Sequence, residues 1–256
     1  MSSYEELYFY PGTHTHRNHF GIRDRAALAR AEALVTADAM KDGLREPFSF
    51  TPEGFQAVHR QMFEGIYPWA GQFRSVDMYK IQSGGRPPVA FVPGDEIKHT
   101  ALPLFCEQVQ DDLTSPREFL AQHKEEFAYR AAVYLKDLNY IHPFPEGNGR
   151  VQRVFLDQLA RQSGYELDQA ALERETWLAA SRESYTQEQF GEHRRMTALI
   201  TGAIHSAQQR QDQTAPAGIQ HKPDFETIKA KAKAAVRRQG QHQERDGPGH
   251  DPEQER

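Results

Sequence analysis

Apolar side chains recur every three or four residues through most of the first 203 positions, and this spacing favours a helical fold. Residues 115–140 are the clearest case, because their apolar side chains fall on one broad stripe of a helix. The stripe consists of Leu120, Phe127, Ala131, Tyr134, Leu135 and Leu138. A helix of this kind buries its stripe against other elements, so we expect a mostly α-helical domain.

Further segments have helical spacing or helix-terminal signals. They are residues 22–43, 51–67, 93–113, 150–164, 172–185 and 192–204. Asp24 and Thr51 stand where N-caps are expected, and Pro52 follows Thr51 at the first helical position. Gly43 is expected to end the first of these helices, and Pro103 is expected to kink the third.

Residues 73–92 do not follow the helical pattern. They combine β-branched and aromatic residues on both sides of a Gly84-Gly85 pair. This arrangement predicts a small β-hairpin, the only one that we expect in the domain.

The chain changes character near residue 204. Residues 204–256 are rich in Gln, Pro, Gly and charge, and such segments bury too little apolar area to offset chain entropy. We expect one domain over residues 1–203 and a polar low-complexity tail over residues 204–256. The tail is predicted to be disordered, apart from a short basic helix that ends at Gly240. An alternative is that it acts as a partner-binding or export signal.

Charge and hydropathy exclude some classes of protein. The net charge of -5 and the pI of about 6.2 argue against a general nucleic-acid binder. No apolar run approaches the roughly 18 residues that a membrane span needs. Cys106 is the single cysteine, so there is no disulfide framework, and we interpret it as a small apolar residue on a helix. These features predict a protein made in the cytoplasm, without excluding export.

A polar segment joins two of the predicted helices. Gly147, Asn148 and Gly149 fall where the second helix begins, and helix N-termini present unpaired N–H groups and partial positive charge. Glycines there let an anion approach the backbone closely. Arg150 and Arg153 lie three residues apart on one face at the same end, and two guanidinium groups suit a polyphosphate.

Two further side chains in this segment suit phosphate chemistry. Glu146 would repel an anion unless a divalent cation bridged the carboxylate and the phosphate, which is how Mg²⁺ usually binds. His142 is able to take a proton from an incoming hydroxyl at neutral pH. Each residue has a simpler interpretation when taken alone, as a turn or a solvated helix face. Their combination and order favour a phosphate site.

The order "HPFPEGNGR" at residues 142–150 resembles the signature of the Fic (filamentation induced by cAMP) family, and Arg153 supplies the family's second arginine. Residues 8–24 resemble the N-terminal segment of toxin-type members, and residues 65–80 resemble the segment that leads into their flap hairpin. The resemblance covers roughly residues 7–203 and implies a Fic-type helical bundle. It places a cluster of three histidines in a variable loop, so we expect no metal site there: His14, His16 and His19.

The resemblance implies transfer of AMP from ATP to a Tyr, Thr or Ser hydroxyl of a target protein. His142 is then the general base, and Glu146 holds Mg²⁺. The phosphates are bound by residues at the start of the following helix: Gly147, Asn148, Gly149, Arg150 and Arg153. The flap holds the target as an added strand, through Lys80, Ile81, Gln82 and Ser83.

Regulation is also implied by the resemblance. Many Fic proteins are inhibited by a helix with Ser or Thr, three further residues, Glu, and Gly or Asn. Ser49 and Glu53-Gly54 match this pattern, but Pro52 argues that Ser49 lies outside the helix. We therefore expect inhibition by a separate small antitoxin, as in class I Fic toxins. The expected targets are topoisomerase subunits for a bacterial toxin, or host proteins for a secreted effector.

Two alternatives to AMP transfer remain open at this point. One is a Fic enzyme with another donor, such as UTP or a phosphocholine carrier, because no residue identified here reads the base. The other is a non-catalytic binding module, which the complete signature argues against. A nucleotide-kinase P-loop is excluded, because no Gly-x-x-x-x-Gly-Lys-Ser/Thr sequence occurs.

Overall fold

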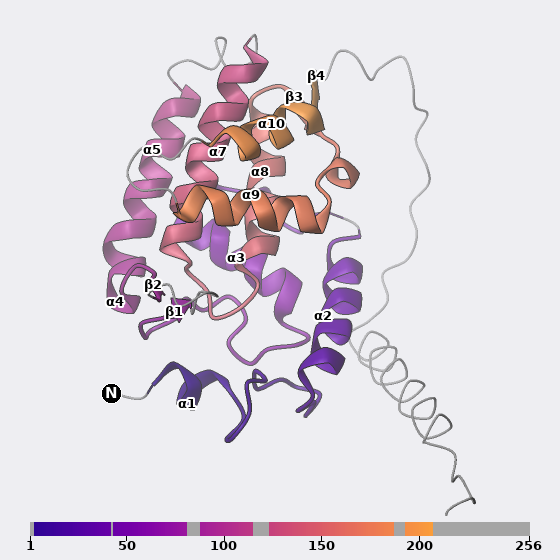
Figure 1. Ribbon diagram of the computed structural model, residues 1–256, viewed down its shortest axis with the longest axis vertical. Coiled ribbons are helices and arrows are strands. Elements are labelled where there is room, and N and C mark those ends of the chain that lie inside the picture. Colours follow the sequence, from indigo (N-terminus) through magenta and orange to yellow (C-terminus); the bar gives the residue numbers. More distant parts are fainter. Residues whose placement is uncertain (1–2, 42, 81–87, 115–122, 187–192, 207–256) are drawn as a thin grey trace, which may run out of the picture. The chain divides into compact units, whose positions relative to one another are not determined.

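The computed structural model describes residues 3–41, 43–80, 88–114, 123–186 and 193–206 (Figure 1). They fall into two compact units. The larger contains the described residues of 1–4, 46–60 and 71–218, and the smaller contains those of 5–45 and 61–70. The proposed division at residue 203 stays a prediction, and most of the predicted tail, residues 207–256, lies outside the described residues.

Helices form most of the described chain, which confirms the predicted α-helical class. The longer helices are α2 (Arg25–Ala39), α3 (Pro52–Phe63), α5 (Leu102–Thr114), α7 (Lys124–Ile141), α8 (Asn148–Gln162), α9 (Arg174–Thr186) and α10 (Arg194–Ala203). The short ones are α1 (Tyr4–Tyr8), α4 (Gly94–Glu96), a π-helical turn (Ile97–Ala101) and a 3₁₀ turn (Gln169–Ala171). The strands are β1 (Tyr79–Lys80), β2 (Val89–Ala90), β3 (Tyr165–Leu167) and β4 (Ile204–Ser206).

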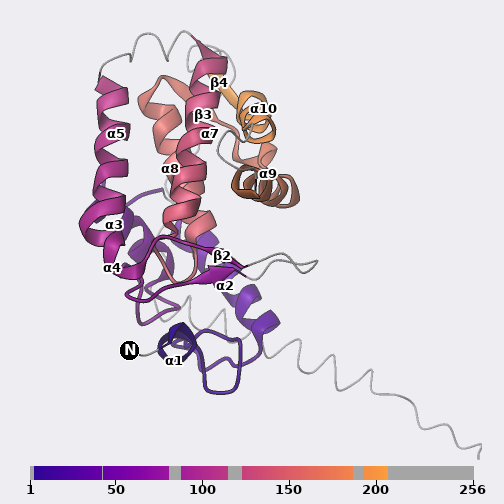
Figure 2. The ribbon, with the colours of Figure 1, turned by 60° about the vertical axis from the view of Figure 1, so that its left-hand side comes forward.

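The larger unit is built around a helical bundle. Helices α5, α7 and α8 run alongside one another, and α9 and α10 pack against α7 (Figures 1 and 2). Phe155 of α8 lies at the centre, fully buried, with its ring 5.8 Å from that of Phe55 and 5.6 Å from that of Phe105. Aromatic rings at these separations add to the apolar burial that holds the helices together.

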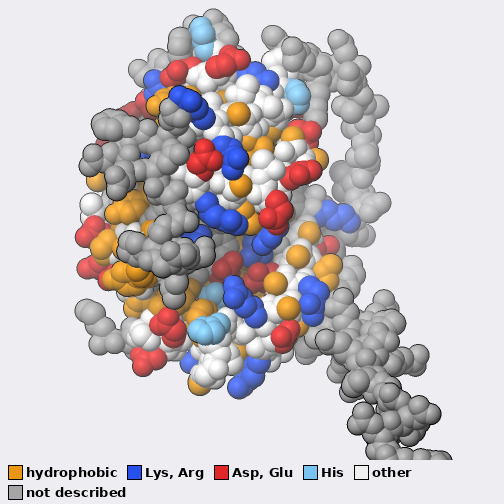
Figure 3. Space-filling model, in the orientation of Figure 1, with side chains coloured by type: hydrophobic (Ala, Val, Ile, Leu, Met, Phe, Trp, Pro, Cys, Tyr) orange, Lys and Arg blue, Asp and Glu red, His pale blue; other side chains and the backbone are white. Residues whose placement is uncertain are grey.

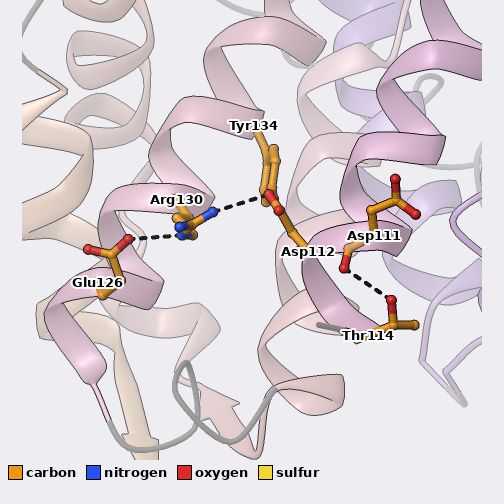
Figure 4. Close-up of polar contacts among 6 residues, drawn as sticks. All are labelled: Asp111, Asp112, Thr114, Glu126, Arg130 and Tyr134. Carbon is orange, nitrogen blue, oxygen red and sulfur yellow. Dashed lines mark hydrogen bonds and ion pairs between the residues drawn. The ribbon is translucent and has the colours of Figure 1, made fainter. Parts of the chain in front are cut away.

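A polar cluster joins α5 to α7 at the edge of this core (Figure 4). Arg130 donates to Glu126 at 2.9 Å and to Asp112 of α5 at 3.3 Å, and the Tyr134 hydroxyl also donates to Asp112. Burial raises the pKa of Tyr134, and the hydrogen bond to Asp112 raises it further. The tyrosine is therefore a permanent donor that keeps the two helices in register.

The predicted helix starts at Asp24 and Thr51 are confirmed. The Asp24 carboxylate accepts from the Ala27 N–H at 2.7 Å, and the Thr51 hydroxyl accepts from the Gly54 N–H at 3.1 Å. Because α3 begins at Pro52, Ser49 lies outside the helix, as expected from the sequence.

One predicted helix end and one predicted kink differ in detail. Helix α2 ends at Ala39, before Gly43, because the Gln61 side chain donates to the carbonyls of both Ala39 and Gly43, at 3.0 and 2.7 Å. The third predicted helix contains a π-helical turn before Pro103, in which the Leu102 N–H donates to the Ile97 carbonyl. Proline lacks an N–H and clashes with the preceding turn, so the chain widens there.

The predicted hairpin is present in its described part. Strands β1 and β2 are antiparallel, with Tyr79 opposite Ala90 and Lys80 opposite Val89, while the Gly84-Gly85 turn lies outside the described residues. A second antiparallel pair, β3 with β4, is absent from the sequence prediction. Its strands are three residues long and far apart in the chain, and residues 204–206 were assigned to the tail.

The smaller unit is held by an aromatic cluster and a side-chain-capped loop. The rings of Tyr67 and Trp69 stack at 4.2 Å, and His16 packs edge-on against Trp69 at 5.9 Å. The Asn18 side chain accepts from the Phe20 and Ile22 N–H groups at 3.2 and 3.0 Å. Across the described parts of both units, no three His, Cys, Asp or Glu side chains are placed to share a metal ion.

Candidate active site

The predicted phosphate site lies in the larger unit, at the turn between α7 and α8. Helix α7 ends at Ile141, and His142 then adopts a left-handed backbone conformation with φ 47° and ψ 61°. It is the one non-glycine residue with positive φ in the described chain. This conformation costs an L-residue roughly 1–2 kcal/mol, so the surrounding contacts must hold it.

The His142 ring is oriented by two contacts. Its Nδ1–H donates to the Asn139 carbonyl at 3.2 Å, and the ring stacks on Phe91 at 4.1 Å. Because a carbonyl only accepts, the proton of the neutral ring is on Nδ1, and Nε2 keeps its lone pair.

The protonation state of His142 suits a base. The pKa of His142 is lowered to about 4. Burial is the main cause and the charges of Arg74 and Lys80 act in the same direction, whereas the Asn139 hydrogen bond and Glu146 oppose them. The ring is therefore neutral at neutral pH. A neutral imidazole with a free Nε2 is able to accept a proton from an attacking hydroxyl.

The turn between His142 and α8 is closed by Asn148. Its side-chain oxygen accepts from the Phe144 N–H at 3.0 Å, and its Nδ2 donates to the Phe144 carbonyl at 2.7 Å. Phe144 is fully buried and anchors the loop in the core. The Asn148 side chain therefore holds the loop closed, and its predicted role in phosphate binding stays a prediction.

The first turn of α8 is arranged for an anion. Gly147 precedes it with φ 88°, a conformation that suits glycine, and no side chain caps this N-terminus. Gly149 is exposed, and a Cβ built on it meets nothing within 4 Å. The space beside Gly149 is therefore open, and a helix N-terminus is a favourable place for an anion.

Charged side chains flank this helix end. Glu146 and Arg150 form an ion pair at 3.3 Å, with 42% and 30% of their side chains exposed. Arg153 lies over the Trp177 ring of α9, 5.1 Å from its centre. Burial lowers the pKa of Arg153, and the positive charge of Arg174 lowers it further, so an anion beside Arg153 would be stabilising.

Two site residues escaped the sequence analysis. His59 of α3 is fully buried, accepts from the Gly71 N–H at 2.8 Å, and donates from Nε2 to the Glu146 carbonyl at 3.0 Å. Its ring stacks on Phe144 at 3.9 Å, and burial lowers its pKa to about 3. A histidine among the apolar positions of a predicted helix is a signal for burial.

The second missed residue is Arg74. It is 1% exposed, and its guanidinium donates to the His142 carbonyl at 2.8 Å. The sequence holds no comparable signal for it, because its partners are backbone carbonyls, which every residue has.

Only part of the predicted target-docking flap is described. Lys80 lies on β1, close enough to His142 for its charge to lower the pKa of that ring. Ile81, Gln82 and Ser83 lie outside the described residues. Figure 2 shows the hairpin crossing beside the ends of α7 and α8. Its role in docking stays a prediction.

The acidic group at the site fits a metal that is shared with a ligand. Glu146 supplies one partly exposed carboxylate. Mg²⁺ is usually held by one or two carboxylates together with substrate phosphates, so this donor set suits Mg²⁺ bound along with a polyphosphate.

Positive and negative side chains are mixed on one visible face of the described chain. Figure 3 shows a face on which Lys and Arg side chains lie among Asp and Glu side chains, without forming a continuous basic area. In the described chain, no helix is both long and apolar enough to cross a membrane.

Residues 49–160 match the model of the Fic/DOC family. Over 188 residues, the chain is 36% identical to a probable protein adenylyltransferase, y4lH, of Sinorhizobium fredii, covering 71% of this chain and 89% of that protein.

Solved structures are also similar. The BepC effector protein of Bartonella tribocorum, with bound AMPPNP, matches with a TM-score of 0.63 and 26% identity, over 78% of this chain and 96% of that chain. The N-terminal Fic domain of an effector from Bartonella quintana, with bound ADP, matches with a TM-score of 0.65 and 25% identity, over 80% and 98%. Both are described as VirB-translocated.

Proposed function

The chain belongs to the Fic/DOC family, and we propose on that basis that it is a protein adenylyltransferase, which moves AMP from ATP to a hydroxyl side chain of a target protein. A relative named as a probable protein adenylyltransferase supports the activity, and neighbours that bind AMPPNP and ADP support a nucleotide substrate.

The reaction needs a base, an anion site and a positioned nucleophile. The target hydroxyl oxygen attacks the α-phosphorus, the bond between that phosphorus and the oxygen bridging to the β-phosphate breaks, and pyrophosphate leaves. His142 Nε2 accepts the hydroxyl proton, since Nδ1 already carries one. The backbone N–H groups at Gly147, Asn148 and Gly149 stabilise the charge on the phosphates. Most of the catalysis is positioning, as is usual for transfer at phosphorus.

The two arginines and the acid have separate roles in this proposal. Arg150 and Arg153 hold the β/γ end of ATP and the leaving pyrophosphate. Glu146 would hold Mg²⁺, which when bound would supply positive charge that neutralises the phosphates. The Glu146–Arg150 pair at 3.3 Å keeps both groups at the helix end before the nucleotide arrives.

The observation that carries the proposal is a neutral His142 with a free Nε2 beside an uncapped helix N-terminus. The test is to incubate the purified chain with ATP labelled at the α-phosphate and a bacterial lysate, and to identify labelled bands by mass spectrometry. We expect His142→Ala to abolish labelling while the circular dichroism spectrum stays native. Full labelling by a folded His142→Ala protein would refute the mechanism.

The same assay also identifies the nucleotide donor and the target protein. Unlabelled UTP and GTP as competitors test whether ATP is preferred. A topoisomerase subunit among the labelled bacterial bands would favour a toxin, whereas labelling only in a eukaryotic lysate would favour an effector. We propose action in the bacterial cytoplasm or, after export, in a recipient cell.

Inhibition is proposed to come from a separate small antitoxin. Two observations support this proposal: the Ser49–Glu53 match begins before α3, and Glu53 is exposed on the first turn of α3. Glu53→Ala is therefore expected to leave the labelling rate unchanged. A large gain in activity would show that the inhibitor is part of this chain.

A further inference from the structure

Arg74 is the largest fully buried side chain among the described residues, with 1% of its surface exposed. A buried guanidinium is costly unless its donors are paired. Its side chain donates to four backbone carbonyls: His142 at 2.8 Å, Val76 at 2.9 Å, Ile141 at 3.1 Å and Val92. One side chain thus joins four points of the backbone.

Two of these carbonyls control the conformation of His142. The last carbonyls of a helix lack intrahelical partners, and those of Ile141 and His142 obtain theirs from Arg74. The backbone N–H of Arg74 also donates to the Pro143 carbonyl at 2.9 Å. Three consecutive carbonyls are therefore fixed, including those on either side of the left-handed His142.

The other two carbonyls belong to the hairpin. Val76 precedes β1 and Val92 follows β2, so the guanidinium holds both ends of the hairpin at once. The Val92 N–H in turn donates to the Tyr140 carbonyl at 3.2 Å, at the end of α7. Arg74 therefore joins the backbone of His142, the proposed proton acceptor, to the open end of the hairpin.

We propose that Arg74 is a positioning residue for adenylyl transfer: it holds His142 in the left-handed conformation and fixes its place relative to the hairpin. The inference rests on the proposed roles of His142 and the hairpin. Without the guanidinium N–H groups of Arg74, the backbone at His142 is free to leave its strained left-handed conformation. The hydrogen bond from His142 Nδ1–H to the Asn139 carbonyl is then lost as well.

The effect should fall on the chemical step rather than on nucleotide binding. The first turn of α8 is held by the Asn148–Phe144 bonds and by His59, which do not involve Arg74. A shift of a reacting group by about 1 Å costs on the order of 100-fold in rate. Lysine keeps the charge of Arg74 but has no planar fork, so Arg74→Lys separates geometry from charge.

The test compares Arg74→Lys with Arg130→Lys, an arginine of the same unit that binds Glu126 and Asp112 away from the loop. Three quantities are measured: the initial labelling rate at saturating ATP, the Kd for ATP, and the ¹H–¹⁵N spectrum of histidine side chains. For Arg74→Lys we expect a labelling rate at least about 100-fold lower, a Kd within about threefold, and loss of the His142 Nδ1–H signal. Arg130→Lys should lower Tm and leave the rate unchanged.

A wild-type rate and Nδ1–H signal in Arg74→Lys would overturn the inference. So would rate losses in both variants that simply follow their losses in Tm. His142→Ala, measured in parallel, separates a failure of the proposed function from a failure of the positioning role. An active His142→Ala protein refutes the proposed function. An inactive His142→Ala protein together with a fully active Arg74→Lys protein refutes only the positioning role. Arg74→Gln provides a second variant in case the lysine protein does not fold.

Discussion

Replacing His59 with glutamine should change how stability depends on pH. The fully buried imidazole accepts from the Gly71 N–H and donates to the Glu146 carbonyl, so it is neutral in the folded protein. Burial lowers its pKa from 6.5 to about 3. In the unfolded chain the same ring takes up a proton near pH 6.5, and the folded ring does not.

The sign follows from this difference in protons bound. As pH falls below 6.5, His59 binds a proton in the unfolded state but not in the folded state, so the free energy of unfolding decreases. Each pH unit costs about 1.4 kcal/mol for one such group, and the loss ends only near the folded pKa. Between pH 7.0 and 4.5, integration gives a loss of about 2.5 kcal/mol that is due to His59 alone.

Glutamine does not titrate, so this loss should be missing in His59→Gln. At pH 7 the variant should be the less stable protein, because it loses the stacking on Phe144 at 3.9 Å and the fit of two hydrogen bonds. The difference in unfolding free energy between the two proteins should then shrink by about 2.5 kcal/mol as pH falls to 4.5. The range from pH 7.0 to 4.5 lies well above the pKa of His59 in the folded protein. The change in unfolding free energy with pH over this range therefore does not depend on the value of that pKa.

The assay is urea denaturation followed by tryptophan fluorescence in a Trp69→Phe background. The chain has two tryptophans, and Trp177 lies in the same unit as His59, whereas Trp69 lies in the other. Fluorescence in this background therefore reports on the unit of interest. Parallel stability curves for the two proteins from pH 7.0 to 4.5 would refute the assignment of a buried neutral His59.

Three further results are expected. In ¹⁵N-labelled protein without nucleotide, the His142 ring should titrate with a midpoint near pH 4, so that about 97% of it is neutral at pH 5.5, and a midpoint near 6.5 would contradict its burial. Gly94→Ala should lower the stability by about 1–3 kcal/mol, because a Cβ there lies 2.6 Å from the Val76 backbone nitrogen, whereas Gly202→Ala, with nothing within 4 Å, should raise Tm. Trp177→Leu should weaken ATP binding by about 3–10-fold by removing the ring under Arg153, while Trp177→Phe should keep most of the affinity, and an unchanged Kd in the leucine variant would argue against a role for that contact.

Much of the fold could be predicted from local patterns. Thr51 and Pro52 mark the start of α3, and Gly147 marks the start of α8, because caps and positive φ depend on the residue at one position. The hairpin was predictable from its composition. The pair β3–β4 could not be predicted, because three-residue strands give no periodicity. Helices α9 and α10 separate the two strands in the sequence, so their pairing depends on how those helices pack.

The candidate site shows a similar division. His142, Glu146 and the α8 residues could be proposed as site residues because their side-chain types occur in a specific order. Arg74 and His59 act on backbone carbonyls, and no sequence position records which carbonyl a side chain reaches. The pattern also gave Asn148 a phosphate role, which stays a prediction, while the two hydrogen bonds of its side chain to the Phe144 backbone could not be read from the sequence.

The pairing of β3 with β4 also fixes the position of Ser206, the last described residue of the larger unit. Ser206 lies opposite Tyr165, just after the C-terminal end of α8, whereas the glycines proposed to bind phosphate lie at its N-terminal end. Fifteen helical residues at 1.5 Å each separate these ends, which is about 22 Å. A tag or tether joined after Ser206 therefore starts at the opposite end of α8 from the proposed nucleotide site, and immobilising the protein through that point should leave the proposed site accessible to large molecules.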